Sequence, residues 1–110
     1  TPGDPRDTTT PAAMAANLRR LILEGRLSPR SRTRLAGWMV ANKTGDAKLR
    51  AGLPKDWRVG DKTGGGGHGT IWPPGRKPAI ACIYMTETQA SFADRNAGIA
   101  DIGRALRAVL

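Results

Sequence analysis

The apolar positions in the first third of the chain recur every three or four residues, which is the spacing of one helix face. A first helix is predicted to begin at Thr10 and Pro11, where a hydroxyl cap precedes a proline, and to end at Gly25. A second helix begins in the same way at Ser28 and Pro29. The side chains expected on the buried faces of these two helices are Met14, Leu18, Leu21, Ile22, Leu35, Trp38 and Met39.

The pattern then changes to that of strands. Apolar and polar residues alternate over residues 57–62, so Val59 and Asp61 are expected on one face of a strand. A lysine, a threonine and a run of glycines follow, and His68, the only histidine, is expected to be exposed in this glycine-rich turn. Residues 79–86 are mostly apolar and predict a second strand.

A last helix closes the chain. Ser91 is expected to cap it, and its buried face is expected to contain Ile99, Ile102, Leu106 and Val109. This helix should pack on the sheet formed by the strands.

Composition limits the possible partners. At 110 residues the chain is at most one small domain, and 18 Lys and Arg against 9 Asp and Glu give a formal charge of +9. The charges are scattered along the expected helices with only one Tyr and one Phe, so nucleic-acid binding is not predicted. Cys82, the only cysteine, excludes an internal disulfide and is expected to be an inert core thiol. No apolar run reaches the length of a membrane span.

The end of the first strand carries the candidate chemistry. From Asp61 to Gly67 the chain presents an ammonium, a hydroxyl and bare backbone, which suit the binding of an anion or a carbonyl oxygen. A Walker loop would need a glycine where Asp61 stands, directly before the lysine. A dinucleotide-binding loop would need a helix after the glycines, and no helical pattern follows. The glycines alone fit a plain hairpin turn equally well.

Longer stretches of the chain resemble one known family. Asp61-Lys62-Thr63-Gly64 resembles the K-T-G element of class A β-lactamases. The segments that resemble the same family are residues 2–11, which match the end of its Ω-loop, Gly37-Trp38-Met39, Leu49 to Pro54, Asp56-Trp57 and Arg95-Asn96. The resemblance implies an α/β fold of the α+β three-layer sandwich type, with an antiparallel sheet flanked by helices. It also implies that residues 1–110 are the C-terminal part of a single catalytic domain.

The resemblance further implies hydrolysis of β-lactam antibiotics through a serine acyl-enzyme, whose nucleophile, S-D-N motif and general base would precede Thr1. Within this segment, catalytic roles are implied for Lys62, as a fixed positive charge, and for Gly65, as an oxyanion-hole N–H donor. Substrate contacts are implied for Thr63, Gly64, Gly66 and Lys48. For Lys48, recognition of the substrate carboxylate and a solvated surface position stay open as alternatives.

Other expectations concern structure and surroundings. Arg50 is expected to pair with Asp61 or nearby backbone, and Asp7 with an arginine upstream of this segment. The resemblance implies a small β-lactam substrate, a monomer, and a periplasmic or secreted location, with no metal, cofactor, nucleic acid or membrane. Two other functions stay open, namely a penicillin-binding transpeptidase or carboxypeptidase and a non-enzymatic basic binding module.

The hairpin after the K-T-G element is short. Only Ile71 and Trp72 stand between the glycine-rich turn and Pro73, which is too little to pair with residues 57–64. We therefore predict that Thr70 and Ile71 are not joined by an ordinary peptide bond and that about six residues are missing between them.

Overall fold

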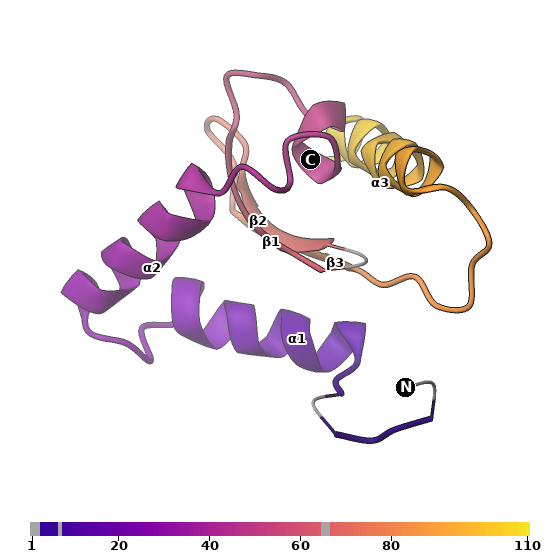
Figure 1. Cartoon of the computed structure of the whole chain (residues 1–110). Coiled ribbons are helices and arrows are strands. Elements are labelled where there is room, and N and C mark those ends of the chain that lie inside the picture. Colours follow the sequence, from indigo (N-terminus) through magenta and orange to yellow (C-terminus); the bar gives the residue numbers. More distant parts are fainter. Residues whose placement is uncertain (1–2, 7, 65–66) are drawn as a thin grey trace.

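The computed structural model describes residues 3–6, 8–64 and 67–110. Its elements are, in chain order, α1 (Pro11–Leu18), the π-helical turn η1 (Arg19–Leu23), α2 (Pro29–Ala41), the 3-10 turn η2 (Leu49–Gly52), β1 (Arg58–Thr63), β2 (Gly67–Trp72), β3 (Ala79–Ile83) and α3 (Phe92–Arg107). The strands form one antiparallel sheet in the order β1-β2-β3, with α1 and α2 on one face and α3 and η2 on the other (Figure 1). The predicted antiparallel sheet flanked by helices is confirmed.

The three α-helices begin at the predicted caps. Thr10, Ser28 and Ser91 each accept a hydrogen bond from the backbone N–H three residues further on, at 3.1 to 3.2 Å. These bonds satisfy N–H groups that have no partner within the helix. After η1 the chain leaves the first helix through Gly25, whose φ of +71° is a conformation that favours glycine.

Each face of the sheet has its own hydrophobic core. The core on the α3 face consists of Leu49, Leu53, Val59, Ile71 and Ile99. The core on the α1 and α2 face consists of Leu18, Ile22, Ala36 and Met39. Because side chains alternate along a strand, neighbouring residues of β2 contribute to opposite cores: Ile71 belongs to the first, and Trp72 packs against the second.

Strand β2 is a complete partner for β1, since six consecutive pairs join residues 58–63 to residues 67–72. Thr70 and Ile71 are consecutive residues of this strand, so the prediction that no ordinary peptide bond joins them is wrong. It fails because it places residues 67–70 in a turn, whereas they pair with both neighbouring strands. Gly69 permits this pairing, because a Cβ atom there would lie 2.5 Å from the carbonyl oxygen of Gly60.

Five predicted burial positions differ in the structure. Trp38 is 67% exposed, because Ala36 and Met39 form the stripe of α2 that packs on the sheet. Near the C-terminus Ile102 and Val109 are 39% and 74% exposed, because α3 packs through Ile99 and small residues. His68 lies in β2 and is half-buried rather than exposed in a turn. Cys82 is half-buried and packs against the core on the α1 and α2 face instead of lying fully inside it.

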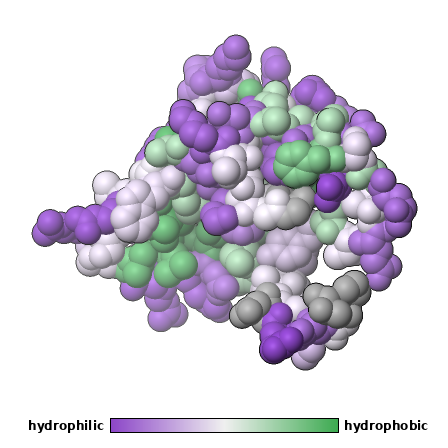
Figure 2. All heavy atoms as spheres, viewed as in Figure 1, coloured by the Kyte–Doolittle hydropathy of each residue, from purple (hydrophilic) through white to green (hydrophobic). Residues whose placement is uncertain are grey.

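One patch of exposed apolar surface borders the strand that carries the candidate chemistry. Hydrophobic side chains lie in the angle between α1 and α2 (Figure 2). A cavity of about 300 Å³ there is lined by Leu18, Leu21, Leu35, Trp38, Met39, Asn42, Asp61, Lys62 and His68. The underside of the strand that carries the candidate chemistry therefore borders an open apolar surface.

Candidate active site

Three predicted site residues, Lys62, Thr63 and Gly64, lie where β1 ends and β2 begins. A cavity of about 450 Å³ is lined there by Lys62, Thr63, Gly64, Gly67, His68, Tyr84, Met85 and Thr86. Lys62 is exposed, and its Nζ donates to the carbonyl oxygen of Thr63 at 2.5 Å. Because the strand is pleated, Lys62 and Thr63 point to opposite faces of the sheet. The strand end thus offers an exposed cation on one side of its backbone and a hydroxyl on the other.

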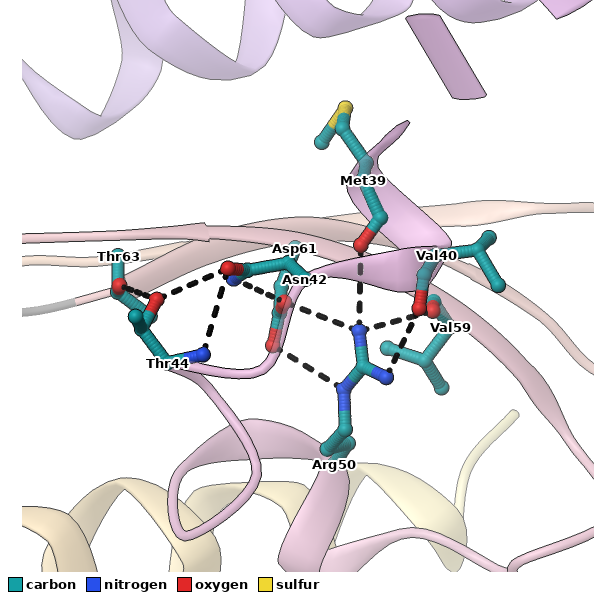
Figure 3. Close-up of polar contacts among 8 residues, drawn as sticks. All are labelled: Met39, Val40, Asn42, Thr44, Arg50, Val59, Asp61 and Thr63. Carbon is teal, nitrogen blue, oxygen red and sulfur yellow. Dashed lines mark hydrogen bonds and ion pairs between the residues drawn. The ribbon is translucent and has the colours of Figure 1, made fainter. Parts of the chain in front are cut away.

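Beneath this strand end lies an ion pair, as predicted for Arg50. Its Nη2 lies 3.0 Å from Oδ1 of Asp61, whose side chain is only 3% exposed. The same guanidinium donates to the carbonyl oxygens of Met39, Val40 and Val59 at 3.1 to 3.2 Å (Figure 3). Arg50 therefore joins the end of α2, the 3-10 turn η2 and β1, which is a structural role.

Hydrogen bonds lead from this ion pair to the K-T-G threonine. Asn42 Nδ2 donates to Asp61 Oδ1 at 2.8 Å, and Asn42 Oδ1 accepts from the Thr44 hydroxyl at 2.9 Å. Thr44 Oγ1 in turn lies 2.5 Å from Thr63 Oγ1 (Figure 3). We call Arg50, Asp61, Asn42, Thr44 and Thr63 the polar chain. Sequence reasoning missed Asn42 and Thr44, because residues 42–46 carry only the signal of a turn.

Lys48 is buried in the structure, with 2% exposure, so a solvated surface position is excluded. Its Nζ donates to Asn96 Oδ1 at 2.6 Å and lies 4.8 Å from the centre of the Phe92 ring. A Cβ atom on Gly67 would lie 3.9 Å from its Cδ, so the lysine stem passes next to the cavity at the strand end. The structure thus places a buried cation close to that cavity.

His68 lies opposite Lys62 on β1 and Cys82 on β3. Burial lowers the pKa of His68, the charge of Lys62 lowers it further, and the charge of Asp61 opposes the shift. Its Nδ1 is buried, with no hydrogen-bond partner among the described residues. Burial also raises the pKa of the Cys82 thiol, which fits an unreactive cysteine.

Some predicted residues cannot be placed. Gly65, Gly66 and Asp7 lie outside the described residues. Gly64 is exposed, and a Cβ atom there would meet nothing within 4 Å. Over residues 3–6, 8–64 and 67–110 no group of three acidic, His or Cys side chains could hold a metal ion. None of the helices in the same ranges has the length and apolar character needed to cross a bilayer.

The structure combines an antiparallel sheet between helical layers with a Lys-Thr-Gly strand end that opens on a cavity. This combination defines a class of proteins that bind and open β-lactams. A model of the β-lactamase enzyme family matches residues 2–110, so this chain belongs to that family.

Individual relatives agree with this assignment. The chain is 48% identical to β-lactamase AER-1 of Aeromonas hydrophila over 113 residues, which cover 97% of this chain and 37% of that protein. It is 47% identical to β-lactamase CTX-M-25 of Escherichia coli, over 94% of this chain and 38% of that protein. The solved structure of an ancestral class A β-lactamase is 57% identical and superposes with a TM-score of 0.95, covering all of this chain and 45% of that one.

The comparisons also show two differences in length. The chain spans less than two-fifths of the length of these curated relatives. Within the matched region the Aeromonas protein is longer, because a match of 113 residues uses only 97% of this 110-residue chain. About six residues of the relative therefore have no counterpart here.

Proposed function

We propose that this chain is the C-terminal part of a class A enzyme that hydrolyses β-lactam antibiotics through a serine acyl-enzyme. The observation that supports it most directly is the β-lactamase family match over residues 2–110, together with a K-T-G strand end that opens on a cavity. The nucleophile and the general base would come from the remainder of the enzyme. This segment contributes recognition of the substrate and stabilisation of charge.

The residues of the strand end have distinct roles in this proposal. Lys62 supplies a positive charge near the nucleophile and the substrate carboxylate, and Thr63 donates a hydrogen bond to that carboxylate. The N–H of Gly65 stabilises the oxyanion, a contribution that can reach roughly 3 kcal/mol. Gly64 and Gly66 keep the edge open for the substrate, because neither has a side chain.

Lys48 is the second cation for the substrate carboxylate. Its ammonium is buried, and the partners found for it among the described residues are neutral, namely the amide of Asn96 and the ring of Phe92. A buried charge with only neutral partners is costly, and a bound anion offsets that cost. A β-lactam carboxylate entering beside Gly67 would supply this anion.

The transpeptidase alternative differs in the fate of the acyl-enzyme. The relatives that match this chain are named β-lactamases, which favours hydrolysis. We further propose that the enzyme is a monomer, acts in the periplasm or after secretion, and needs no cofactor. Deacylation then proceeds rapidly, whereas a transpeptidase would retain a long-lived acyl adduct.

A chimeric enzyme tests the proposal. Residues 1–110 are placed after the N-terminal part of the Aeromonas relative, and hydrolysis of a chromogenic cephalosporin is measured. We expect multiple turnovers by the chimera and none by residues 1–110 alone, since no S-x-x-K nucleophile is present in them. A folded chimera that does not turn over, or turnover by the 110-residue chain alone, would refute the proposal.

A substitution in the same chimera tests the site. Lys62→Ala should lower kcat/KM at least about tenfold, or roughly 1.4 kcal/mol of transition-state stabilisation. Thr63→Ala should cost less, because it removes a neutral donor rather than a charge. A silent Lys62→Ala variant with an intact fold would show that this strand is not part of the active site.

A further inference from the structure

The directions of the hydrogen bonds in the polar chain follow from two contacts of the Asn42 amide. The backbone N–H of Thr44 can only donate, and it lies 3.3 Å from Asn42 Oδ1. The carboxylate of Asp61, paired with Arg50, accepts from Asn42 Nδ2. Both contacts require the same orientation of the Asn42 amide, with its oxygen toward Thr44 and its nitrogen toward Asp61.

The orientation of Asn42 decides which hydroxyl donates next. An amide oxygen only accepts, so the single hydroxyl hydrogen of Thr44 is used in its 2.9 Å bond to Asn42. Thr44 has no second hydrogen for Thr63, whose oxygen lies 2.5 Å away. In this structure Thr63 is therefore the donor, and its hydrogen points to Thr44 rather than to the cavity.

We propose that Thr44 is a positioning residue for the K-T-G threonine, and that substrate binding reverses the last two hydrogen bonds of the polar chain. This inference rests on the proposed function, in which Thr63 donates to the substrate carboxylate. When Thr63 turns its hydrogen to the carboxylate, Thr44 turns its own from Asn42 to the oxygen of Thr63. Two hydroxyl groups rotate, and no covalent bond or proton transfer is involved.

The reversal has a small cost and a clear benefit. Asn42 Oδ1 loses the Thr44 hydroxyl but keeps the Thr44 backbone N–H at 3.3 Å. Thr63 then accepts from Thr44 while it donates to the carboxylate, and consecutive hydrogen bonds strengthen one another. Arg50 anchors the other end of the polar chain on three backbone carbonyls, so Thr63 is held relative to α2 as well as to its own strand.

The test uses the active chimera and two substrates, a chromogenic cephalosporin with a free ring carboxylate and the methyl ester of that carboxylate. Thr44→Val removes the hydroxyl at nearly constant volume. We expect it to raise KM for the acid about three- to tenfold, the value of one hydrogen bond, with kcat changed by less than about twofold. KM for the ester should stay unchanged, and Thr44→Ser should keep the KM of the unaltered enzyme.

Two controls separate positioning from a general structural effect. In a Thr63→Val background, Thr44→Val should have no further effect on KM, since its action passes through Thr63. Thr33→Val makes the same change at an exposed position of α2 and should leave both substrates unaffected. An unchanged or lower KM for the acid, an equal rise for the ester, or additive effects with Thr63→Val would overturn the proposal.

A measurement without turnover distinguishes this inference from the proposed function. Three-bond couplings of the Thr63 side chain, measured by NMR in the chimera, should have the values of a single rotamer. In the Thr44→Val variant the couplings should have averaged values, which indicate several rotamers, whereas in Thr44→Ser they should stay unchanged. An inactive chimera that shows this change would refute hydrolysis and keep the positioning contact. A Thr63 rotamer that is averaged before any substitution would refute the positioning role, whatever the activity.

Discussion

Removal of Arg50 should be among the most damaging single changes to the stability of this fold. Arg50→Met keeps much of the aliphatic stem but removes the guanidinium, which leaves Asp61 as a buried charge without its cation. It also removes the donor to the carbonyl oxygens of Met39, Val40 and Val59. Breaking a buried ion pair from one side costs about 3 to 5 kcal/mol, a large part of the 5–15 kcal/mol typical of a whole domain.

The two partners of the ion pair are not equivalent. The side chain of Arg50 is 21% exposed and keeps its three carbonyl partners when Asp61 is changed, whereas Asp61 is 3% exposed. Asp61→Asn should therefore cost less than Arg50→Met, at about 1 to 3 kcal/mol. The double variant should be more stable than the sum of the two losses predicts, because the uncompensated charge is then absent.

Urea unfolding followed by tryptophan fluorescence measures these free energies, and an unchanged m-value shows that both states keep their compactness. The reasoning would be refuted if Arg50→Met cost less than about 1 kcal/mol, below the range for a broken buried pair. It would also be refuted if Asp61→Asn cost more than Arg50→Met, or if the two losses were additive.

Two further predictions concern glycine and histidine positions. Gly45→Ala should destabilise the chain, because its Cβ would lie 2.6 Å from Cγ of the buried Asp61. Gly37→Ala, on the exposed side of α2, should instead stabilise the chain by up to about 1 kcal/mol, because alanine favours a helix more than glycine does. The urea midpoints of the two variants check both predictions. The pKa of His68 is lowered from its usual 6.5, so the unfolded chain binds more protons, and stability should fall as the pH drops below that value. An NMR titration of the imidazole checks the shift, and His68→Gln should flatten this part of the pH dependence.

Local chemistry made several features predictable. Hydroxyl caps, helix periodicity and the alternation in β1 act over a few residues, so the sequence shows them directly. The pairing of Arg50 with Asp61 could also be predicted, because a charged residue on the inner face of a strand needs a partner of opposite charge. The K-T-G strand end was identified from its letters and from the matching segments around it.

Other features depend on contacts between distant residues. The contact of Thr44 with Thr63 joins positions 19 residues apart, and neither residue carries a signal of it. Lys48 is buried, and its partners Phe92 and Asn96 lie on α3, more than 40 residues further along the chain. The pairing of β2 was missed because its glycines favour a turn by local propensity, whereas the neighbouring strands impose an extended conformation.

Strand β3 (Ala79–Ile83) has a consequence for handling the molecule. Within the described part of the chain it is paired with β2 on one side only, at the border of the sheet. Its outer backbone N–H and C=O groups can add a strand from another molecule, and Ile80 and Ile83 are apolar with no charge between them. Overproduced by itself at high concentration, the chain is therefore prone to edge-to-edge aggregation, and a lysine introduced on this strand would protect it.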